Sequence, residues 1–430
     1  SRVGDRVGQQ PSHPWLSARV SDGRGESSLR GTLSSAQHWI LDGHRTLAGH
    51  ALIPGTGYLE LARAALRAYG ETGPFEIEDL FFVRPFAVAD GEARELFVKL
   101  RPTARGYRFE VRGHVSVGGR AGTVLIAQAH LALQLAAAPA DLGAAELADI
   151  EARCTTSHLG PVGPDESGLR TAQEAHLRFG PRWRVLREAH LGRTEGIARL
   201  ALPPPFTAES SDFGLHPALL DIATGWAMSL IEGYDASTLY VPVSYERARV
   251  YHDLTPQLLS WVRTPVVNHA DAEFVFFDVT LMDPSGRVLM EVERLGLRRM
   301  SGGPDFALGA RVAPTDVTFH EDSSEHAPSP GEALRDRLLQ QGIRTAEGQD
   351  ALGRVLQQLA PKSGGAPAQI FVSSMDLPTL VKQSSAGEKV RSAGAGLELA
   401  RPDLGVDYVA PRDEVEKTLV GFWQELLGVD

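Results

Sequence analysis

The sequence contains a single cysteine, Cys154, among its 430 residues. One thiol cannot form a disulfide within the chain, so the hydrophobic core must stabilise the fold, as is typical of proteins from a reducing compartment. Long hydrophobic runs are also missing, since no stretch approaches the roughly 20 apolar residues that a transmembrane helix needs. We therefore expect a cytoplasmic protein without a membrane-spanning segment.

Positive charge is scarce as well. Lysine and arginine number 43 against 54 aspartate and glutamate residues, which gives a formal net charge of −11. A nucleic-acid-binding surface needs a basic stripe, so this balance argues against nucleic acid as a partner. Glycine-rich phosphate loops and the serine elbow of hydrolases are not found. Three histidines at six-residue intervals, His38, His44 and His50, match the ligand spacing of neither a helix nor a strand, so we predict no metal site.

The most informative stretch runs from residue 38 to residue 69. Its second half has apolar residues at helical spacing, namely Tyr58, Leu61, Ala62, Ala65, Leu66 and Tyr69. We predict a helix that Thr56 caps and Gly70 ends, with its charged residues off the apolar stripe and a sheet wrapped round it. Residues 39–41 are expected to form a short strand that leads to His44. An imidazole beside an apolar helix is a candidate general base, and a surface loop histidine is the equally weighted alternative.

The order of predicted elements then repeats. Short alternating strands follow the first helix up to residue 135, and a second helix opens at Pro217, with further strands from residue 239 to residue 297. One helix among antiparallel strands is an α+β arrangement, so two such halves indicate an internal duplication. We accordingly divide the chain into a first half with His44 (1–140), a connector (141–165), a second half with Asp221 (166–300), a polar linker (301–410) and a terminal amphipathic segment (411–430).

Four stretches carry a resemblance to a known family. They are His-Pro-Trp-Leu at 13–16, the run from His44 to Pro54 with the helix after it, Phe-Gly-Pro at 179–181 and His-Pro-Ala-Leu-Leu-Asp at 216–221. In this order and spacing, over about residues 12–300, the chain resembles the dehydratase domains of modular polyketide synthases. The resemblance implies an α+β double hotdog, in which two tandem antiparallel sheets are each wrapped round a long helix. By position, it implies His44 and Asp221 as the catalytic pair and the following substrate-binding residues: Gly49, Pro54, Gly55, Phe179, Gly180, Pro181 and Gly225.

The implied reaction removes water from a 3-hydroxyacyl thioester to give the 2,3-unsaturated thioester in polyketide biosynthesis. An imidazole with a near-neutral pKa can take the α-proton, and a carboxylic acid kept protonated by an apolar wall can protonate the leaving hydroxide. Taken alone, Asp221 could be an aspartate without a catalytic role in the first turn of a helix, where the helix dipole stabilises a negative charge by about 0.3–1 kcal/mol. No cofactor is implied beyond the phosphopantetheine of an acyl carrier protein. The carrier and other megasynthase domains are the implied partners, with a homodimer left open.

Three departures from the family pattern keep alternatives open. Four residues rather than three separate His44 from Gly49, and Phe179 stands where the family often has tyrosine. Gly225 stands one turn after Asp221, where the family usually has a glutamine or histidine that can hydrogen-bond the carboxyl. A roomier or drier site of this kind would suit a cyclase that forms a cyclic ether, or a double-bond isomerase. A non-catalytic hotdog that binds a carrier is the third alternative.

The last 130 residues resemble connective sequence of such assembly lines. Residues 333–382 resemble the segment that follows a ketoreductase, and residues 408–430 resemble the first helix of an acyl-carrier domain. We therefore expect a piece of a longer polypeptide in which residues 12–300 fold without the tail.

Overall fold

A computed structural model describes residues 13–21, 27–133, 138–164, 166–300, 316–319 and 350–355. Contacts divide the chain into two units, Ser1–Ser323 and Ser324–Asp430. In the second unit, the described residues 350–355 are helical. The carrier-like segment 411–430 and the ketoreductase-like tail, apart from those six residues, lie outside the described residues. The predicted domain boundaries stay predictions.

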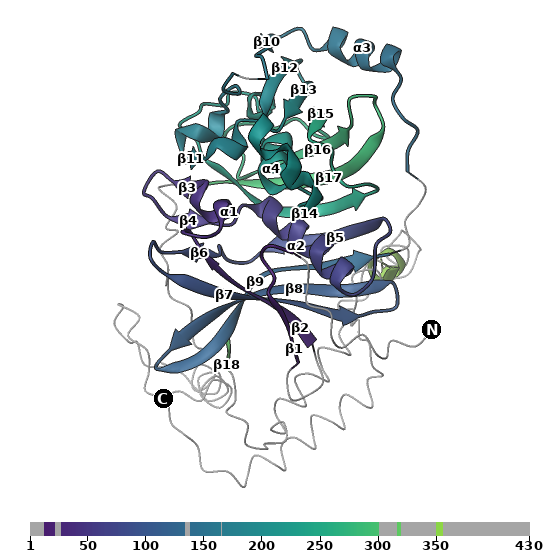
Figure 1. Cartoon of the computed structure of the whole chain (residues 1–430). Coiled ribbons are helices and arrows are strands. Elements are labelled where there is room, and N and C mark those ends of the chain that lie inside the picture. The colour runs from purple at the N-terminus through teal and green to yellow at the C-terminus, as the bar shows by residue number, and fades with distance from the viewer. Residues whose placement is uncertain are drawn as a thin grey trace, which may run out of the picture. The chain divides into compact units, whose positions relative to one another are not determined.

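The first half places the helix α2 (Gly55–Ala68) against an antiparallel sheet (Figure 1). In sheet order, its strands are β1 (Ala18–Ser21), β2 (Ser27–Ser34), β7 (Ala93–Pro102), β8 (Gly106–Val117), β9 (Arg120–Ala132) and β5 (Phe75–Phe82). Residues 56–66 of α2 are all buried, which agrees with the expectation that something larger wraps this helix. The helix begins after Pro54 rather than at a threonine cap. It ends at Ala68, and its C-cap Tyr69 is followed by Gly70 with a φ of 88°.

Two charged side chains of α2 are buried rather than solvent-exposed. The Glu60 carboxylate, 0% exposed, accepts hydrogen bonds from the backbone N–H of Leu215 at 2.6 Å and from Nη1 of Arg63 at 3.0 Å. Arg63 in turn donates from Nε to Asp253 at 2.7 Å. Both residues lie off the apolar stripe, and they are buried all the same because both the sheet and the second half pack on α2. Each buried charge is therefore paired, as burial requires.

The second half repeats the pattern with a shorter helix, α4 (Pro217–Gly225), which gives way to the 3₁₀ turn η4 (Met228–Leu230). Its strands, in sheet order, are β14 (Tyr240–Val250), β17 (Val288–Arg299), β16 (Phe274–Met282), β15 (Gln257–Arg263), β13 (Glu195–Ala201), β12 (Leu186–Leu191) and β10 (Ser157–Leu159). Before them in the chain comes the short helix α3 (Ala144–Arg153), which lies in the connector.

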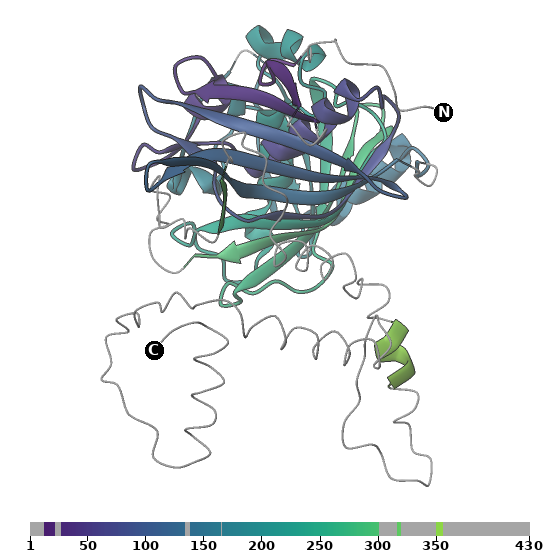
Figure 2. The same cartoon turned by 90° about the horizontal axis from the view of Figure 1, so that it is seen from below.

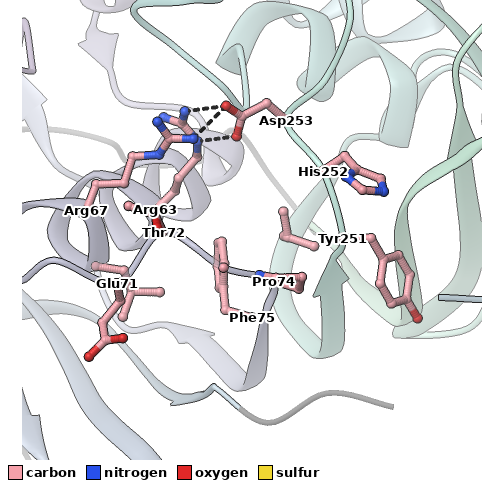
Figure 3. A pocket seen from close by; sticks show the side chains of 12 residues that line it. Arg63, Arg67, Glu71, Thr72, Pro74, Phe75, Tyr251, His252 and Asp253 are labelled. Atoms are coloured by element: carbon pink, nitrogen blue, oxygen red, sulfur yellow. Dashed lines mark hydrogen bonds and ion pairs between the residues drawn. The ribbon is translucent and has the colours of Figure 1, made fainter. Parts of the chain in front are cut away.

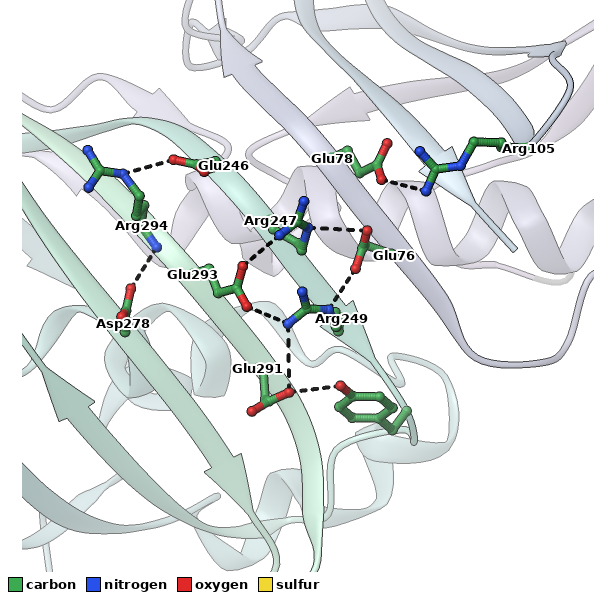
Figure 4. Close-up of polar contacts among 11 residues, drawn as sticks. Glu76, Glu78, Arg105, Glu246, Arg247, Arg249, Asp278, Glu291, Glu293 and Arg294 are labelled. Carbon is green, nitrogen blue, oxygen red and sulfur yellow. Dashed lines mark hydrogen bonds and ion pairs between the residues drawn. The ribbon is translucent and has the colours of Figure 1, made fainter. Parts of the chain in front are cut away.

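The two halves share one sheet. Strand β5 of the first half pairs with β14 of the second in an antiparallel register, with Leu80 opposite Tyr245, so a single 14-stranded sheet runs through both. In Figure 2 the blue and green strands accordingly run side by side. Charged side chains reinforce the junction (Figure 4): Arg249 on β14 donates to Glu76 on β5 at 2.7 Å and to Glu293 on β17 at 2.5 Å. Pairing the two edges removes exposed strand edges that would invite aggregation. This is the expected α+β double hotdog, with its sheets joined rather than separate.

A small four-stranded sheet supports the candidate site. Its strands, in order, are β11 (Leu177–Phe179), β3 (His44–Thr46), β4 (Ala51–Leu52) and β6 (Ala87–Val88). The segment before β3 is the short helix α1 (Trp39–Asp42), closed by a 2.7 Å hydrogen bond from the N–H of Gly43 to the carbonyl of Trp39. Our prediction of a strand at residues 39–41 is therefore wrong. A three-residue apolar run buries equally well in either conformation, so periodicity cannot separate the two.

Part of the expected linker belongs to the first half. Strand β18 (Val317–Phe319) pairs with β9, with Val317 opposite Val124 and Phe319 opposite Gly122. A Cβ at Gly122 would lie 2.5 Å from the side chain of Val317, so glycine permits this close approach.

Elsewhere among the described residues are the 3₁₀ helices η1 (Ala172–Ala175), η2 (Pro181–Trp183) and η3 (Pro204–Ser211). No helix in the described part of the chain has the length and apolarity to cross a membrane.

Candidate active site

His44 begins β3, where the backbone pairing with β11 places it directly opposite Phe179. Its side chain is buried, and Nδ1 lies 3.0 Å from the carbonyl oxygen of Leu52. A carbonyl can only accept, so Nδ1 must carry the hydrogen, and the lone pair of a neutral ring is left on Nε2. The backbone thus selects the tautomer that a general base needs.

Asp221 lies in the second turn of α4. That helix begins with Pro217, and the side chain of His216 accepts a hydrogen bond from the N–H of Leu219 at 3.4 Å. The hydroxyl of Thr56 donates to the carbonyl of Pro217 at 3.0 Å, so the predicted cap of α2 instead ties the starts of the two helices together. This arrangement brings Oδ2 of Asp221 to 3.9 Å from Nε2 of His44.

Burial sets the electrostatics of this pair. Removal from water lowers the pKa of His44, while the nearby Asp221 carboxylate opposes that shift. Burial likewise raises the pKa of Asp221, opposed by His44 and by a hydrogen bond from Trp183. Desolvation disfavours both charged forms and favours a neutral imidazole beside a protonated carboxyl. A base and an acid of that kind are what an elimination requires.

Trp183 is a site residue that our sequence analysis missed. It ends η2, and its indole N–H donates to Oδ2 of Asp221 at 2.8 Å. Its ring lies parallel to that of Phe179, with centroids 5.9 Å apart, and His44 packs against both rings at 5.9 and 5.8 Å. The two aromatic rings therefore form an apolar wall on one side of the imidazole. Phe179 keeps water from His44 without supplying a hydroxyl.

Two glycines allow this wall to form. The N–H of Gly180 donates to the carbonyl of Gly43 at 2.8 Å, and a Cβ at Gly180 would lie 2.8 Å from the Cα of Gly43. A Cβ at Gly43 would lie 2.6 Å from the ring of Trp183. In the sequence, Gly43 directly precedes His44 and Gly180 directly follows Phe179, and this pattern could have indicated a close backbone approach. Pro181, the first residue of η2, starts the turn that carries Trp183 to Asp221.

Gly49, Pro54 and Gly55 have local reasons for their residue type. Gly49 has a φ of 93° in the turn between β3 and β4, a conformation that favours glycine. Pro54 is the N-cap of α2, and a Cβ at Gly55 would lie 3.1 Å from the ring of Phe82. Their predicted contact with substrate stays a prediction.

The space beside Gly225 is filled. Gly225 is the last residue of α4, and a Cβ there would lie 2.3 Å from Nε2 of Gln173, which η1 supplies. The glutamine side chain occupies the volume that a longer side chain at position 225 would take. The roomier pocket that we expected at this position is therefore not present. An amide from another element stands one helical turn from Asp221.

A separate pocket of about 340 Å³ lies at the far end of α2 (Figure 3). Arg63 and Arg67 of α2 converge there on Asp253, each at 2.7 Å. Asp253 is thus paired with both arginines, and Arg63 also pairs with Glu60. Neither His44 nor Asp221 lines this pocket. We assign it no part in the chemistry.

Comparison with known proteins gives the family. A family model described as "Polyketide synthase dehydratase domain" matches residues 13–114, and one described as "Polyketide synthase dehydratase N-terminal domain" matches residues 152–306. Polyketide synthase PksN of Bacillus subtilis is 23% identical over 77% of the chain, and polyketide synthase GfsA of Streptomyces halstedii is 28% identical over 97%. The chain spans only 6% and 5% of the length of these two relatives.

The fold also matches a solved structure. A trans-AT polyketide synthase dehydratase domain from Brevibacillus brevis aligns with a TM-score of 0.59 and 22% identity, covering 68% of this chain and 100% of that one. The segment that the first family model matches contains His44, and the segment that the second matches contains Asp221. The chain belongs to the polyketide synthase dehydratase family.

Proposed function

We propose that this chain removes water from a 3-hydroxyacyl thioester held on an acyl carrier protein and releases the 2,3-unsaturated thioester. The observation that supports this most strongly is the buried pair of His44 and Asp221, with Nε2 and Oδ2 3.9 Å apart. Each half of the chain supplies one member, and burial favours the protonation state that each role needs.

His44 acts as the base in this proposal. The lone pair of Nε2 takes the proton from the α-carbon, and the electrons of that C–H bond move toward the thioester carbonyl. The hydrogen bond from Nδ1 to Leu52 keeps the ring oriented during the transfer. Helix α2 begins three residues after Leu52, and the positive N-terminal end of its dipole can stabilise negative charge on the thioester oxygen.

Asp221 acts as the acid. As the bond between the β-carbon and its oxygen breaks, the bonding electrons leave with the oxygen, which takes the carboxyl proton and departs as water. The electrons held on the thioester enolate return to form the double bond between the α- and β-carbons. Water leaves, with a protonated imidazole and a carboxylate remaining. Transfer of the proton from Nε2 back to Oδ2 restores both groups. Proton transfers account for every step, so we propose no cofactor beyond the carrier's phosphopantetheine.

We further propose that the partners are an acyl carrier protein and neighbouring domains of a megasynthase. The relatives are far longer polyketide synthases, which supports a multidomain setting. We propose a cytoplasmic location from cysteine usage alone, and we leave a homodimer as a prediction. The cyclase and isomerase alternatives gain no support from Gly225, because Gln173 fills the volume beside it.

The test is to incubate the protein with a 3-hydroxyacyl pantetheine thioester and follow the product by mass spectrometry. We expect a product lighter by one water that absorbs as a conjugated enoyl thioester. On a substrate that carries a further remote hydroxyl, a product of that mass without the conjugated absorption would indicate a cyclase. On a substrate without one, the same result would indicate a double-bond isomerase. Carrier binding with no change in substrate mass would show a non-catalytic domain.

A further inference from the structure

Two histidines lie side by side on neighbouring strands at the edge of the sheet, outside the candidate active site. His158 on the edge strand β10 is the register partner of His190 on β12. Their rings are stacked, with centroids 4.2 Å apart and planes inclined by 17°. Glu188 lies two residues before His190 on the same strand, so its side chain points to the same face.

The donor atoms of these residues have the spacing of a metal site. Oε1 of Glu188 lies 3.2 Å from Nε2 of His158 and 3.2 Å from Nε2 of His190. All three donor atoms lie within 4.8 Å of one another. Ligands at tetrahedral positions about 2.0–2.1 Å from a zinc ion are separated by roughly 3.3 Å. Small side-chain adjustments would therefore suffice for coordination.

Neighbouring charges hold the carboxylate in place. Nε of Arg199 on β13 lies 3.3 Å from Oε2 of Glu188, so the arginine engages the oxygen that faces away from the histidines. Arg199 also pairs with Glu151 of α3, which offsets part of its positive charge. Glu188 is thus an anionic ligand that a second residue orients, as in many metal sites.

We propose that His158, His190 and Glu188 bind a divalent transition-metal cation of the zinc type, with water in the fourth position. Two imidazoles and one carboxylate are a donor set that suits Zn²⁺. The ion would join β10, whose three residues are exposed, to β12 in the body of the second half. The ion would have a structural role, because it would fix β10 to the rest of the sheet. It would take no part in the reaction, because it would lie apart from His44 and Asp221.

The test uses the full chain after dialysis against a chelator, titrated with zinc chloride in a calorimeter. We expect one tight equivalent per chain, weakened at least tenfold by His158→Ala and by Glu188→Gln. His269→Ala is the matched control, because His269 is an exposed histidine that lies 3.6 Å from a single carboxylate, Glu232. It should leave the tight equivalent intact.

A crystal grown with zinc should show an anomalous peak between His158 and His190. Zinc should also raise the melting temperature of the wild-type chain but not that of the His158→Ala chain. Equal zinc affinity in wild type and both site variants would overturn the proposal. A peak elsewhere, with none between these histidines, would do the same.

Discussion

The indole N–H of Trp183 donates a 2.8 Å hydrogen bond to Oδ2 of Asp221, the carboxylate oxygen that faces Nε2 of His44. The same oxygen of Asp221 therefore accepts a hydrogen bond from the indole and lies next to the candidate base. Gly225 lacks the side chain that the family usually places beside this carboxyl, and Trp183 supplies a hydrogen-bond donor from another element. The donor comes from η2, 38 residues before the aspartate.

Trp183→Phe should slow dehydration while keeping the aromatic wall. We expect a loss of roughly 10- to 100-fold in kcat, equivalent to one hydrogen bond to a charged group. The hydrogen bond lowers the pKa of Asp221, so its removal should raise that pKa further. Because the acid must be protonated, the alkaline limb of the pH–rate profile should move to higher pH.

The matched control is Trp226→Phe, which removes an indole N–H that donates to Ser260 at 3.1 Å. It should leave the pH profile in place. If both variants shifted the alkaline limb equally, Trp183 would have no specific effect on Asp221.

Asp221→Asn should make the protein more stable at neutral pH although it removes the acid. The folded-state pKa of Asp221 is raised by burial, so the folded state holds its proton more tightly than the unfolded state does. The wild type therefore loses stability as the pH rises from the unfolded-state pKa of about 3.9 through the raised folded value. Denaturant melts of both proteins at several pH values measure this.

The stability gap between the asparagine variant and the wild type should be small near pH 4 and should widen toward pH 7. A gap that is constant across that range, or that narrows as the pH rises, would mean that burial does not raise the pKa of Asp221.

Gly180→Ala should destabilise the protein and reduce its activity. The new methyl would lie 2.8 Å from the Cα of Gly43, so the backbone itself must move. We expect a cost of about 1–3 kcal/mol in the free energy of unfolding, as for other overpacked sites. The same movement would displace Phe179 and Trp183 from His44. Gly73→Ala is the control, because a Cβ there meets no atom within 4 Å. Equal stability of the two variants would contradict the close approach of Gly180 to Gly43.

Ending the chain at residue 300 should lower its stability relative to ending it at residue 323. Only the longer form keeps β18 on β9, the ion pair between Arg84 and Asp316 at 2.5 Å, and the packing of Phe319 under Arg120. Burial of Val317 alone suggests about 1–3 kcal/mol. This revises our expectation that residues 12–300 fold without the tail. Identical unfolding midpoints would show that β18 contributes nothing.

Helical and strand periodicity was sufficient to predict two α+β halves, each with one helix among antiparallel strands. The double hotdog and the pair His44 and Asp221 were implied by the resemblance to polyketide synthase dehydratases, which rests on short local motifs. Trp183 was missed because its contact with Asp221 depends on the turn of η2 and on the approach of two glycines. The burial of Glu60 and the pairing of β5 with β14 were missed because each depends on the other half of the chain. The helix at residues 39–42 was missed because so short an apolar run lacks a distinguishing period.

The most direct test of the account is the single-turnover rate of dehydration in His44→Ala and Asp221→Asn. Each variant should fold, as judged by circular dichroism, and each should lose roughly 10²–10⁴-fold in rate, the contribution of one general acid or base. A variant that keeps more than about a tenth of the wild-type rate would contradict the role given to that residue.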